Sequence, residues 1–267
     1  MMLLFPGFVS GQEDWQGFMQ QFPDHLDISL QIQDETGAPL FQQHADKKIP
    51  SASIIKIPIL IAFMEKVENK EIDLDARYSL QATDKVAGAG ELQHLPDGSG
   101  ITFRYLAEEM IRISDNTATN ILIQAIEMDY IQDWLKENGY EDTQLNRIMM
   151  DFKAIEEGRQ NYTSPQEIND ILINLWNGKW LKENSRAEIM HWLKGSADNS
   201  TIPSQLPAGT MVAHKTGTLD YVRGDAGIIF GDKPLVLSVF VENFNTMEEA
   251  ESVIGRIALK SFRDFGR

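Results

Sequence analysis

The sequence contains no cysteine, which excludes disulfides, a thiolate nucleophile and cysteine-ligated zinc. Its five histidines are scattered and include no His-x-x-x-His pair, so we expect no histidine metal site. Whatever chemistry the chain performs therefore has to come from hydroxyl, amine, amide and carboxylate side chains.

Basic residues are also scarce. Lys and Arg number 24 against 40 Asp and Glu, giving a net charge of −16. A surface of this sign repels nucleic acid phosphates and anionic lipids. We therefore expect a small-molecule substrate, no nucleic acid partner, no membrane partner and a monomeric protein.

No long hydrophobic run is present. The first nine residues, Met1–Val9, are apolar, but they have no basic flank and are interrupted by Pro6 and Gly7. They are too short for a secretory signal or a membrane span. The prediction is a cytoplasmic protein, although an exported protein whose signal had been removed would have a similar sequence.

Hydrophobic residues make up 42% of the 267 residues, enough for one sizeable core. Alternating apolar residues predict a hairpin over Leu26–Gln33 and Pro39–Gln43, and helical periodicity extends from about 51 to 193. Three strands, at Met211–His214, Ala226–Phe230 and Leu235–Val241, and a helix over Met247–Phe265 follow.

This order predicts an α+β fold, a five-stranded antiparallel sheet flanked by terminal helices beside an all-helical lobe. We expect a single domain over 1–267, with its sheet lobe at about 1–48 and 203–267 and its helical lobe at about 51–200. The seam between two such lobes is a natural cleft.

Three short motifs occur in order along the chain: Ser53-Ile-Ile-Lys56, Ser114-Asp115-Asn116 and Lys215-Thr216-Gly217. Each alone has an ordinary explanation, such as a helix N-cap or a strand that ends in a turn. A Ser-x-x-Lys arises by chance roughly once in a chain of this size, and each of the other triplets in roughly one chain in twenty. The ordered set is much rarer.

The first motif stands at the start of an apolar helix, where residues three apart share a face. Lys56 is therefore expected to reach the Ser53 hydroxyl. The positive end of the helix dipole favours a developing anion on Ser53, and desolvation near a second cation would lower the pKa of Lys56. Together they predict a serine nucleophile with a lysine base.

The ordered motifs resemble those of class A β-lactamases and penicillin-binding proteins. The resemblance covers most of the chain and implies the β-lactamase/transpeptidase-like fold, acyl transfer through an ester on Ser53, and no cofactor. Ser114 would pass a proton to the leaving nitrogen. The implied substrate-binding residues are Asn116 for an amide side chain, Lys215 and Thr216 for a carboxylate, Gly217 for close approach, and Thr218, whose backbone N–H would form the oxyanion hole with that of Ser53.

The chain departs from the family pattern in the loop that supplies the deacylating base. Thr143-Gln-Leu-Asn-Arg147 resembles the Thr-x-Leu-x-Arg that opens this loop, and Asn161 would close it. In this register the position of the family's glutamate is Met149, and that of its assisting asparagine is Lys153. In the family an aspartate closes the loop and forms an ion pair with the arginine. Because Asn161 stands at that position here, the ion pair is weakened to a hydrogen bond at best.

A second register matches Leu145-Asn146 to the Leu-Asn that follows the glutamate in the family. It places Asp142 where the family has its glutamate and makes the loop longer. Asp151, which also lies in the loop, is another candidate base, although a surface charge or a partner for Arg147 is the plainer interpretation. Arg223 lies near the position of a helper arginine for the substrate carboxylate, in an uncertain register.

Three hypotheses follow. The first is β-lactam hydrolysis through Ser53, with slow deacylation because the loop lacks its glutamate. The second is a D-alanyl-D-alanine peptidase-like or esterase activity, which the same loss favours. The third is a penicillin-binding protein that does not turn over. Rates with a chromogenic β-lactam, an ester and a D-Ala-D-Ala peptide would separate them.

Overall fold

The structure is a computed structural model that describes residues 14–267. The apolar segment Met1–Val9 and the start of the predicted opening helix lie outside the described residues. Within them, residues 14–19 are helical. No helix in the described part of the chain is both long and apolar enough to cross a membrane.

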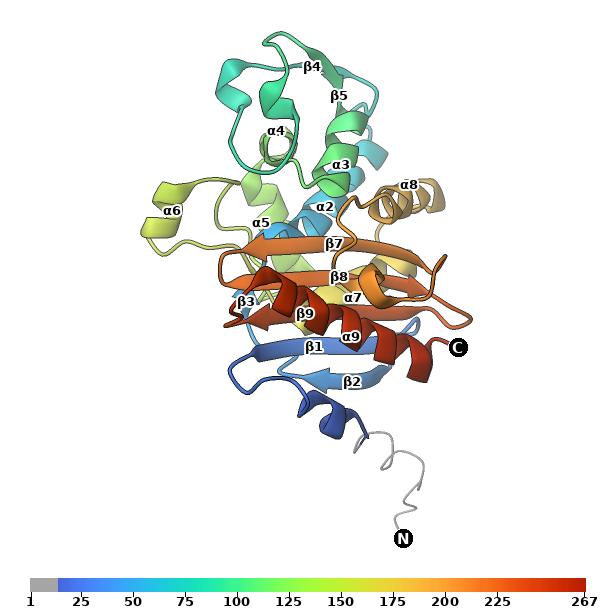
Figure 1. The fold of residues 1–267 in the computed structure, drawn as a ribbon. Coiled ribbons are helices and arrows are strands. Elements are labelled where there is room, and N and C mark those ends of the chain that lie inside the picture. The colour runs from blue at the N-terminus through green and yellow to red at the C-terminus, as the bar shows by residue number, and fades with distance from the viewer. Residues whose placement is uncertain (1–13) are drawn as a thin grey trace.

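The centre of the fold is a five-stranded antiparallel sheet in the order β2-β1-β9-β8-β7 (Figure 1). The order pairs the hairpin directly with the last strand. The strands are β1 (Asp27–Asp34), β2 (Pro39–Gln43), β7 (Met211–Leu219), β8 (Val222–Phe230) and β9 (Leu235–Glu242). This confirms the predicted sheet, and it leaves β7 as an edge strand beside the helices.

Two apolar cores form because the strands alternate their side chains between the two faces of the sheet. Ile28, Leu30 and Ile32 of β1 belong to one core, which α9 (Met247–Phe265) and residues 14–19 cover. On the opposite face α7 (Pro165–Trp176) packs against β1 and β9. In Figure 1 α9 lies in front of the sheet.

The helical part lies next to β7, above the sheet in Figure 1. Its central element is α2 (Lys56–Glu68), of which residues 56–64 are all buried. Such an all-round apolar helix must be enclosed by others. The helices that contact it are α3 (Phe103–Arg112), α4 (Asn116–Ile126), α5 (Met128–Glu137) and α8 (Glu183–Lys194).

Short elements complete the chain. The small strand pairs are β3 (Ile49–Pro50) with β6 (Tyr162–Thr163), and β4 (Arg77–Ser79) with β5 (Gly100–Thr102). The 3-10 turns are η1 (Ala52–Ile55), η2 (Ala82–Asp84), η3 (Leu92–His94) and η4 (Ile202–Gln205), and α6 is Phe152–Glu156. The pair β3–β6 ties the segment before Ser53 to the end of the loop that follows Arg147.

Candidate active site

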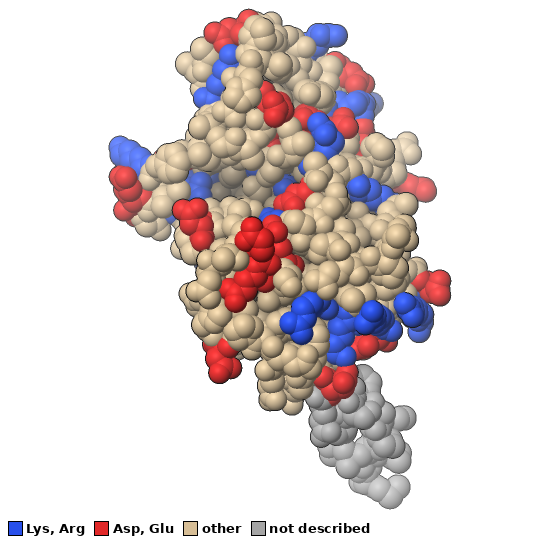
Figure 2. All heavy atoms as spheres, in the orientation of Figure 1, with Lys and Arg blue, Asp and Glu red and all other residues tan. Residues whose placement is uncertain are grey.

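A cavity of about 530 Å³ opens between the helical part and β7. Figure 2 shows the hollow on this face, with basic and acidic atoms on its walls. Residues from all three motifs line it, together with residues that no motif predicts. The polar and charged lining residues are Ser53, Arg112, Ser114, Asn116, Ser196, Asp198, Lys215, Thr216 and Thr218.

Ser53 lies in η1, the 3-10 turn that leads directly into α2, and its side chain is partly exposed to the cavity. The turn begins at Ala52, whose φ of 45° lies in the left-handed region. This bend precedes the helix and presents Ser53 at the helix's N-terminal end, where the backbone N–H groups favour negative charge.

Lys56, the first residue of α2, is fully buried. Its Nζ donates to the Ser114 carbonyl (2.6 Å) and to Asn116 Oδ1 (3.0 Å), and it lies 3.0 Å from Ser114 Oγ. Burial, and then the positive charge of Lys215, hold the pKa of Lys56 well below its usual range. A lowered pKa favours the neutral amine, which is the form that can accept a proton.

These contacts differ from the expected bond between Lys56 and Ser53, since no hydrogen bond joins the two residues in the described structure. A buried amine is directed by the acceptors nearest to it, and the segment before α4 supplies them. The amine therefore contacts Ser114, which lines the cavity together with Ser53.

Ser114 takes its position from a strained turn. Its φ is 62°, in the left-handed region, and it connects α3 to α4. Asp115 caps α4 by accepting from Ala118 N (2.8 Å), and its other oxygen accepts from Leu92 N (2.9 Å). The motif's aspartate is thus structural, and it holds Ser114 in place against the neighbouring loop.

That neighbouring loop contains Gly88 and Gly90, both with positive φ. A Cβ on Gly90 would lie 2.1 Å from Asp115 Oδ2, so only glycine fits there. Asn116 Nδ2 donates to Ala87 O (3.3 Å), which leaves its amide engaged on both sides while it lines the cavity.

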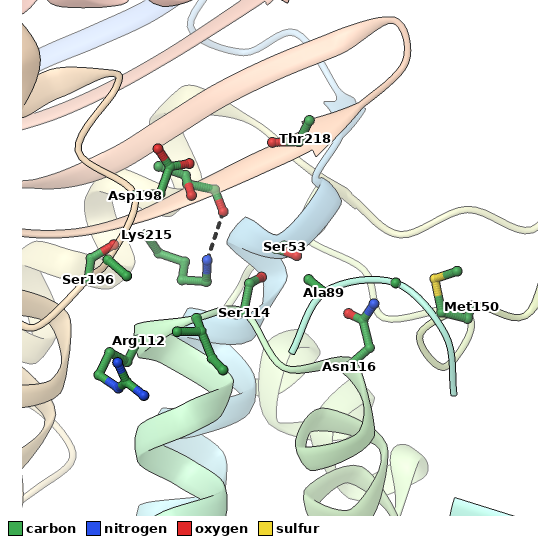
Figure 3. A pocket seen from close by; sticks show the side chains of 14 residues that line it. Ser53, Ala89, Arg112, Ser114, Asn116, Met150, Ser196, Asp198, Lys215 and Thr218 are labelled. Carbon is green, nitrogen blue, oxygen red and sulfur yellow. Dashed lines mark hydrogen bonds between the residues drawn. The ribbon is translucent and has the colours of Figure 1, made fainter. Parts of the chain in front are cut away.

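Lys215 stands on β7, which extends through Leu219, further than the predicted strand. It is 1% exposed, and its Nζ donates to Thr216 O (3.0 Å), as Figure 3 shows. Burial lowers the pKa of Lys215 to about 8, even though Asp225 and Asp198 oppose the shift. Most of its charge is retained at neutral pH and is directed at the cavity.

Gly217 has a different role from the one predicted. It does not line the cavity, and a Cβ there would lie 3.0 Å from Ser51 O and 3.1 Å from Ala52 Cβ. The glycine therefore lets η1 pack directly against β7, and this contact fixes the distance between Ser53 and the lysine strand. The group that approaches Gly217 closely in this structure is the backbone at Ser51, within the protein itself.

Arg223 lies opposite Thr218 in the β7–β8 pairing, which resolves its register. It is 2% exposed and does not line the cavity. Its guanidinium donates to Thr218 Oγ1 (2.6 Å) and Asp198 Oδ2 (2.7 Å). Arg223 thus supports the cavity-lining Thr218 from outside the cavity, and its observed contacts are with protein groups.

The loop after Arg147 is closed by amides. Asn161 Oδ1 accepts from the backbone N–H groups of Asn146 (2.8 Å) and Arg147 (3.0 Å), while the Arg147 guanidinium donates to Gln160 Oε1 (2.6 and 3.0 Å). The hydrogen bond expected of Asn161 is present, but it joins the arginine's backbone. Gln160, which sequence reasoning missed, takes the side chain.

Met149, which the first register places at the position of the family's glutamate, is 7% exposed and belongs to the apolar core. Asn120 holds its backbone in place by accepting from its N–H (2.8 Å) and donating to its carbonyl (3.1 Å). The neighbouring Met150 lines the cavity instead. Lys153 is exposed and lies outside the lining.

Neither candidate base from the loop lines the cavity. Asp142 lies near Glu167, and burial followed by that negative charge raises the pKa of Asp142. Asp151 Oδ1 accepts from Ala154 N (3.0 Å) and caps α6. Both carboxylates therefore have other surroundings. The carboxylate that does line the cavity is Asp198, in a Ser-Ala-Asp segment without a motif.

Comparison with known proteins agrees with this geometry. The profile of the β-lactamase enzyme family matches residues 12–265. β-Lactamase VEB-1 of Pseudomonas aeruginosa is 27% identical over 230 residues, covering 80% of this chain and 77% of that protein. β-Lactamase CTX-M-6 of Salmonella typhimurium is 30% identical over 202 residues, covering 73% and 69%.

Two solved structures are similar over nearly the whole chain. PBP-A has a TM-score of 0.86 at 28% identity and covers 96% of both chains. A β-lactamase from Sphaerobacter thermophilus has a TM-score of 0.86 at 30% identity, covering 95% of this chain and 96% of that one. Fold and cavity define a penicillin-recognising serine enzyme. The chain belongs to the β-lactamase enzyme family and is a serine hydrolase, in a family that acts on β-lactam amides.

Proposed function

We propose that the protein opens β-lactam amides by acylation of Ser53 and releases the product slowly. The observation that supports this most strongly is the buried Lys56 amine, whose pKa is lowered and which contacts Ser114, while Ser114 and Ser53 line the same cavity. A nucleophile next to a base with a lowered pKa is the arrangement that acyl transfer needs.

The hydrogen bonds of Lys56 suggest the path of the proton. In its neutral form the amine has two protons, which can go to Ser114 O and Asn116 Oδ1, and its lone pair would then accept from Ser114 Oγ–H, 3.0 Å away. As Ser53 Oγ attacks the carbonyl carbon, its proton moves to this Ser114–Lys56 pair. Ser114 then protonates the lactam nitrogen as the C–N bond breaks.

Substrate placement would use the β7 side of the cavity. Lys215 supplies the positive charge and Thr216 a hydroxyl for the substrate carboxylate, with Thr218 beside them. The backbone N–H groups of Ser53 and Thr218 would stabilise the oxyanion. Asn116 lies at the opposite side, where the amide side chain of a substrate would bind. The protein would act as a monomer on a small molecule, without nucleic acid, membrane or cofactor.

Slow release is proposed because no suitable base faces the ester. Within the described cavity lining, the carboxylate is that of Asp198, which accepts from Arg223 and from Ser200. Burial would raise the pKa of Asp198, but these hydrogen bonds and the arginine's charge lower it far below its usual value. A carboxylate so stabilised is a weak general base.

The same observation favours a second candidate function, a peptidase, esterase or penicillin-binding activity in which the acyl-enzyme persists. The likeness to PBP-A is compatible with it. A point mutant of PBP-A, solved as an acyl-enzyme complex with penicillin G, has a TM-score of 0.87 and 28% identity with this chain. A long-lived ester on a related fold is what weak deacylation would produce.

The test is a labelled penicillin followed by intact-protein mass spectrometry of the wild type and Ser53→Ala. We expect one adduct per molecule in the wild type, located on Ser53, and none in the variant. An adduct on another residue with Ser53 unmodified would refute the mechanism. Turnover of a chromogenic cephalosporin, an ester and a D-Ala-D-Ala peptide then separates the first function from the second.

A further inference from the structure

Acidic partners already surround the cations at the Lys215 end of the cavity. Arg223 pairs with Asp198 (2.7 Å) and with Glu251 (3.0 Å). Arg112, on the same side of the cavity, forms a bidentate pair with Glu109 (2.8 and 2.9 Å). Among the described residues that line the cavity, Lys215 is the cation without an ion pair.

Asp198 differs from the other two acids because it lines the cavity itself. Its side chain is 40% exposed, whereas Glu251 lies on α9 outside the lining. Figure 3 shows Asp198 and Lys215 on the same wall of the pocket. Asp198 is close enough to Lys215 to affect the pKa of its amine, so its charge also reaches a group bound there.

A substrate carboxylate held by Lys215 would therefore face a fixed negative charge as well as a positive one. In an environment with an effective dielectric constant of about 20, a like charge about 10 Å away costs enough to change affinity roughly tenfold. An uncharged amide at the same place avoids this cost.

We propose that Asp198 is a specificity-determining residue that disfavours a free carboxylate at the Lys215 end and favours acyl donors that are uncharged there. This inference rests on the proposed acylation of Ser53. The substrate class it indicates is an ester, thioester or amide whose leaving group ends in an uncharged polar group, such as a carboxamide. β-Lactams that carry a carboxylate would still react, but with a lower kcat/KM than comparable acyl donors that are uncharged at this position.

The test uses two thioesters that deliver the same acyl group, N-benzoyl-D-alanyl thioglycolate and the corresponding thioglycolamide. In both, Ser53 Oγ forms an ester with the acyl carbon, the C–S bond breaks and the thiol leaves with a proton. Because the acyl-enzyme and the two thiols are the same for every variant, a change in the ratio of the two kcat/KM values between variants reports recognition of the leaving group. Released thiol gives the rates.

Asp198→Asn should move this ratio about tenfold towards the carboxylate donor, because the amide keeps an acceptor for Arg223 and removes the charge. Asp198→Glu retains the charge and should stay within about twofold of the wild type. Glu251→Gln is the matched control: it removes an equal charge from Arg223, but from outside the cavity lining, so the ratio should change clearly less than in Asp198→Asn.

An unchanged ratio in Asp198→Asn, or a shift of the same size in Glu251→Gln, would refute the inference while the benzoyl-D-alanyl adduct on Ser53 upheld the proposed function. Absence of that adduct with both donors would refute the proposed function and the inference with it. Thermal unfolding of each variant shows whether a lost rate reflects lost folding, and the ratio within one variant is independent of the folded fraction.

Discussion

Replacement of Lys56 by Met tests the proposed base directly. Lys56 is fully buried and its amine contacts Ser114 and Asn116. Methionine has a similar length and shape but accepts no proton. General base assistance is typically worth about 10²–10⁴-fold, so acylation of Ser53 should slow by that factor. The assay is the rate of adduct formation with a labelled penicillin, measured by mass spectrometry.

The free energy of unfolding should also respond to Lys56→Met, and in the opposite direction from that expected for a simple loss of contacts. Because the pKa of Lys56 is lowered in the folded protein, the unfolded chain binds more protons between the folded and the usual value. Stability of the wild type therefore rises with pH through that window and is diminished below it. Lys56→Met should lose this pH dependence in denaturant unfolding. Removal of the buried amine should raise the free energy of unfolding, but the acceptors on Ser114 and Asn116 lose their hydrogen bonds and offset part of that increase.

Ser114→Ala shows whether the lysine acts through the serine. If the proton passes along the pair, each single variant should be about as slow as the double variant. If Lys56 acts on Ser53 alone, the two losses should multiply. An acylation rate for Lys56→Met within about threefold of the wild type, with a normal adduct on Ser53, would place the base elsewhere and refute the reasoning.

Three further predictions concern release, pH and packing. Penicillins should give a burst equal to the enzyme concentration and then slow turnover, since a missing base costs roughly 3–5 kcal/mol. Met150 lines the cavity, so Met150→Glu should speed the slow phase more than Met149→Glu. Fast turnover without a burst would contradict this prediction. KM for a carboxylate substrate should rise as pH passes about 8, where Lys215 loses its charge; a constant KM well above that pH would oppose it. Gly217→Ala places a methyl group 3.0 Å from Ser51 O and should destabilise the fold by about 1–3 kcal/mol in denaturant unfolding, with slower acylation.

The fold was predictable wherever one periodicity extended over a whole element. The hairpin and the helix over Met247–Phe265 have clear patterns, and they form as expected. Helix α8 lies within the stretch predicted to be helical up to about 193, but its start was not predicted, because its first turns are polar and its N-cap, Lys182, makes no side-chain capping bond. The five-residue α6 is too short to show a period.

The candidate site was predictable only as far as its motifs. Ser53, Lys56, Ser114 and Lys215 carry recognisable spacing; the structure places Ser53, Ser114 and Lys215 around one cavity and buries Lys56 against Ser114. Asp198 lies in a loop without any such pattern, and its role depends on Arg223, which is 25 residues away in sequence. Pairings of this kind are determined by tertiary structure and leave no local signal.

Backbone strain explains why motif spacing did not predict the contacts of the amine. Among the described residues, Ala52, Ser114 and Met150 have φ values of 45°, 62° and 62°, in a region that non-glycine residues rarely adopt. Each lies in the cavity wall or directly before Ser53. Such conformations cost of order 1–3 kcal/mol each and persist only where the surrounding fold over-determines them.

The constraints on these residues come from other elements of the fold. The backbone N–H of Ser51, just before Ala52, donates to Asn161 O (2.9 Å), and the N–H of Asp115, just after Ser114, donates to Glu109 O (3.1 Å). No propensity rule places an alanine or a serine in the left-handed region from its own neighbours. The sequence thus identifies the reacting groups, whereas their mutual geometry is a property of the whole fold. For this reason a three-residue spacing predicted a direct bond from Lys56 to Ser53, and the folded chain instead directs the amine to Ser114.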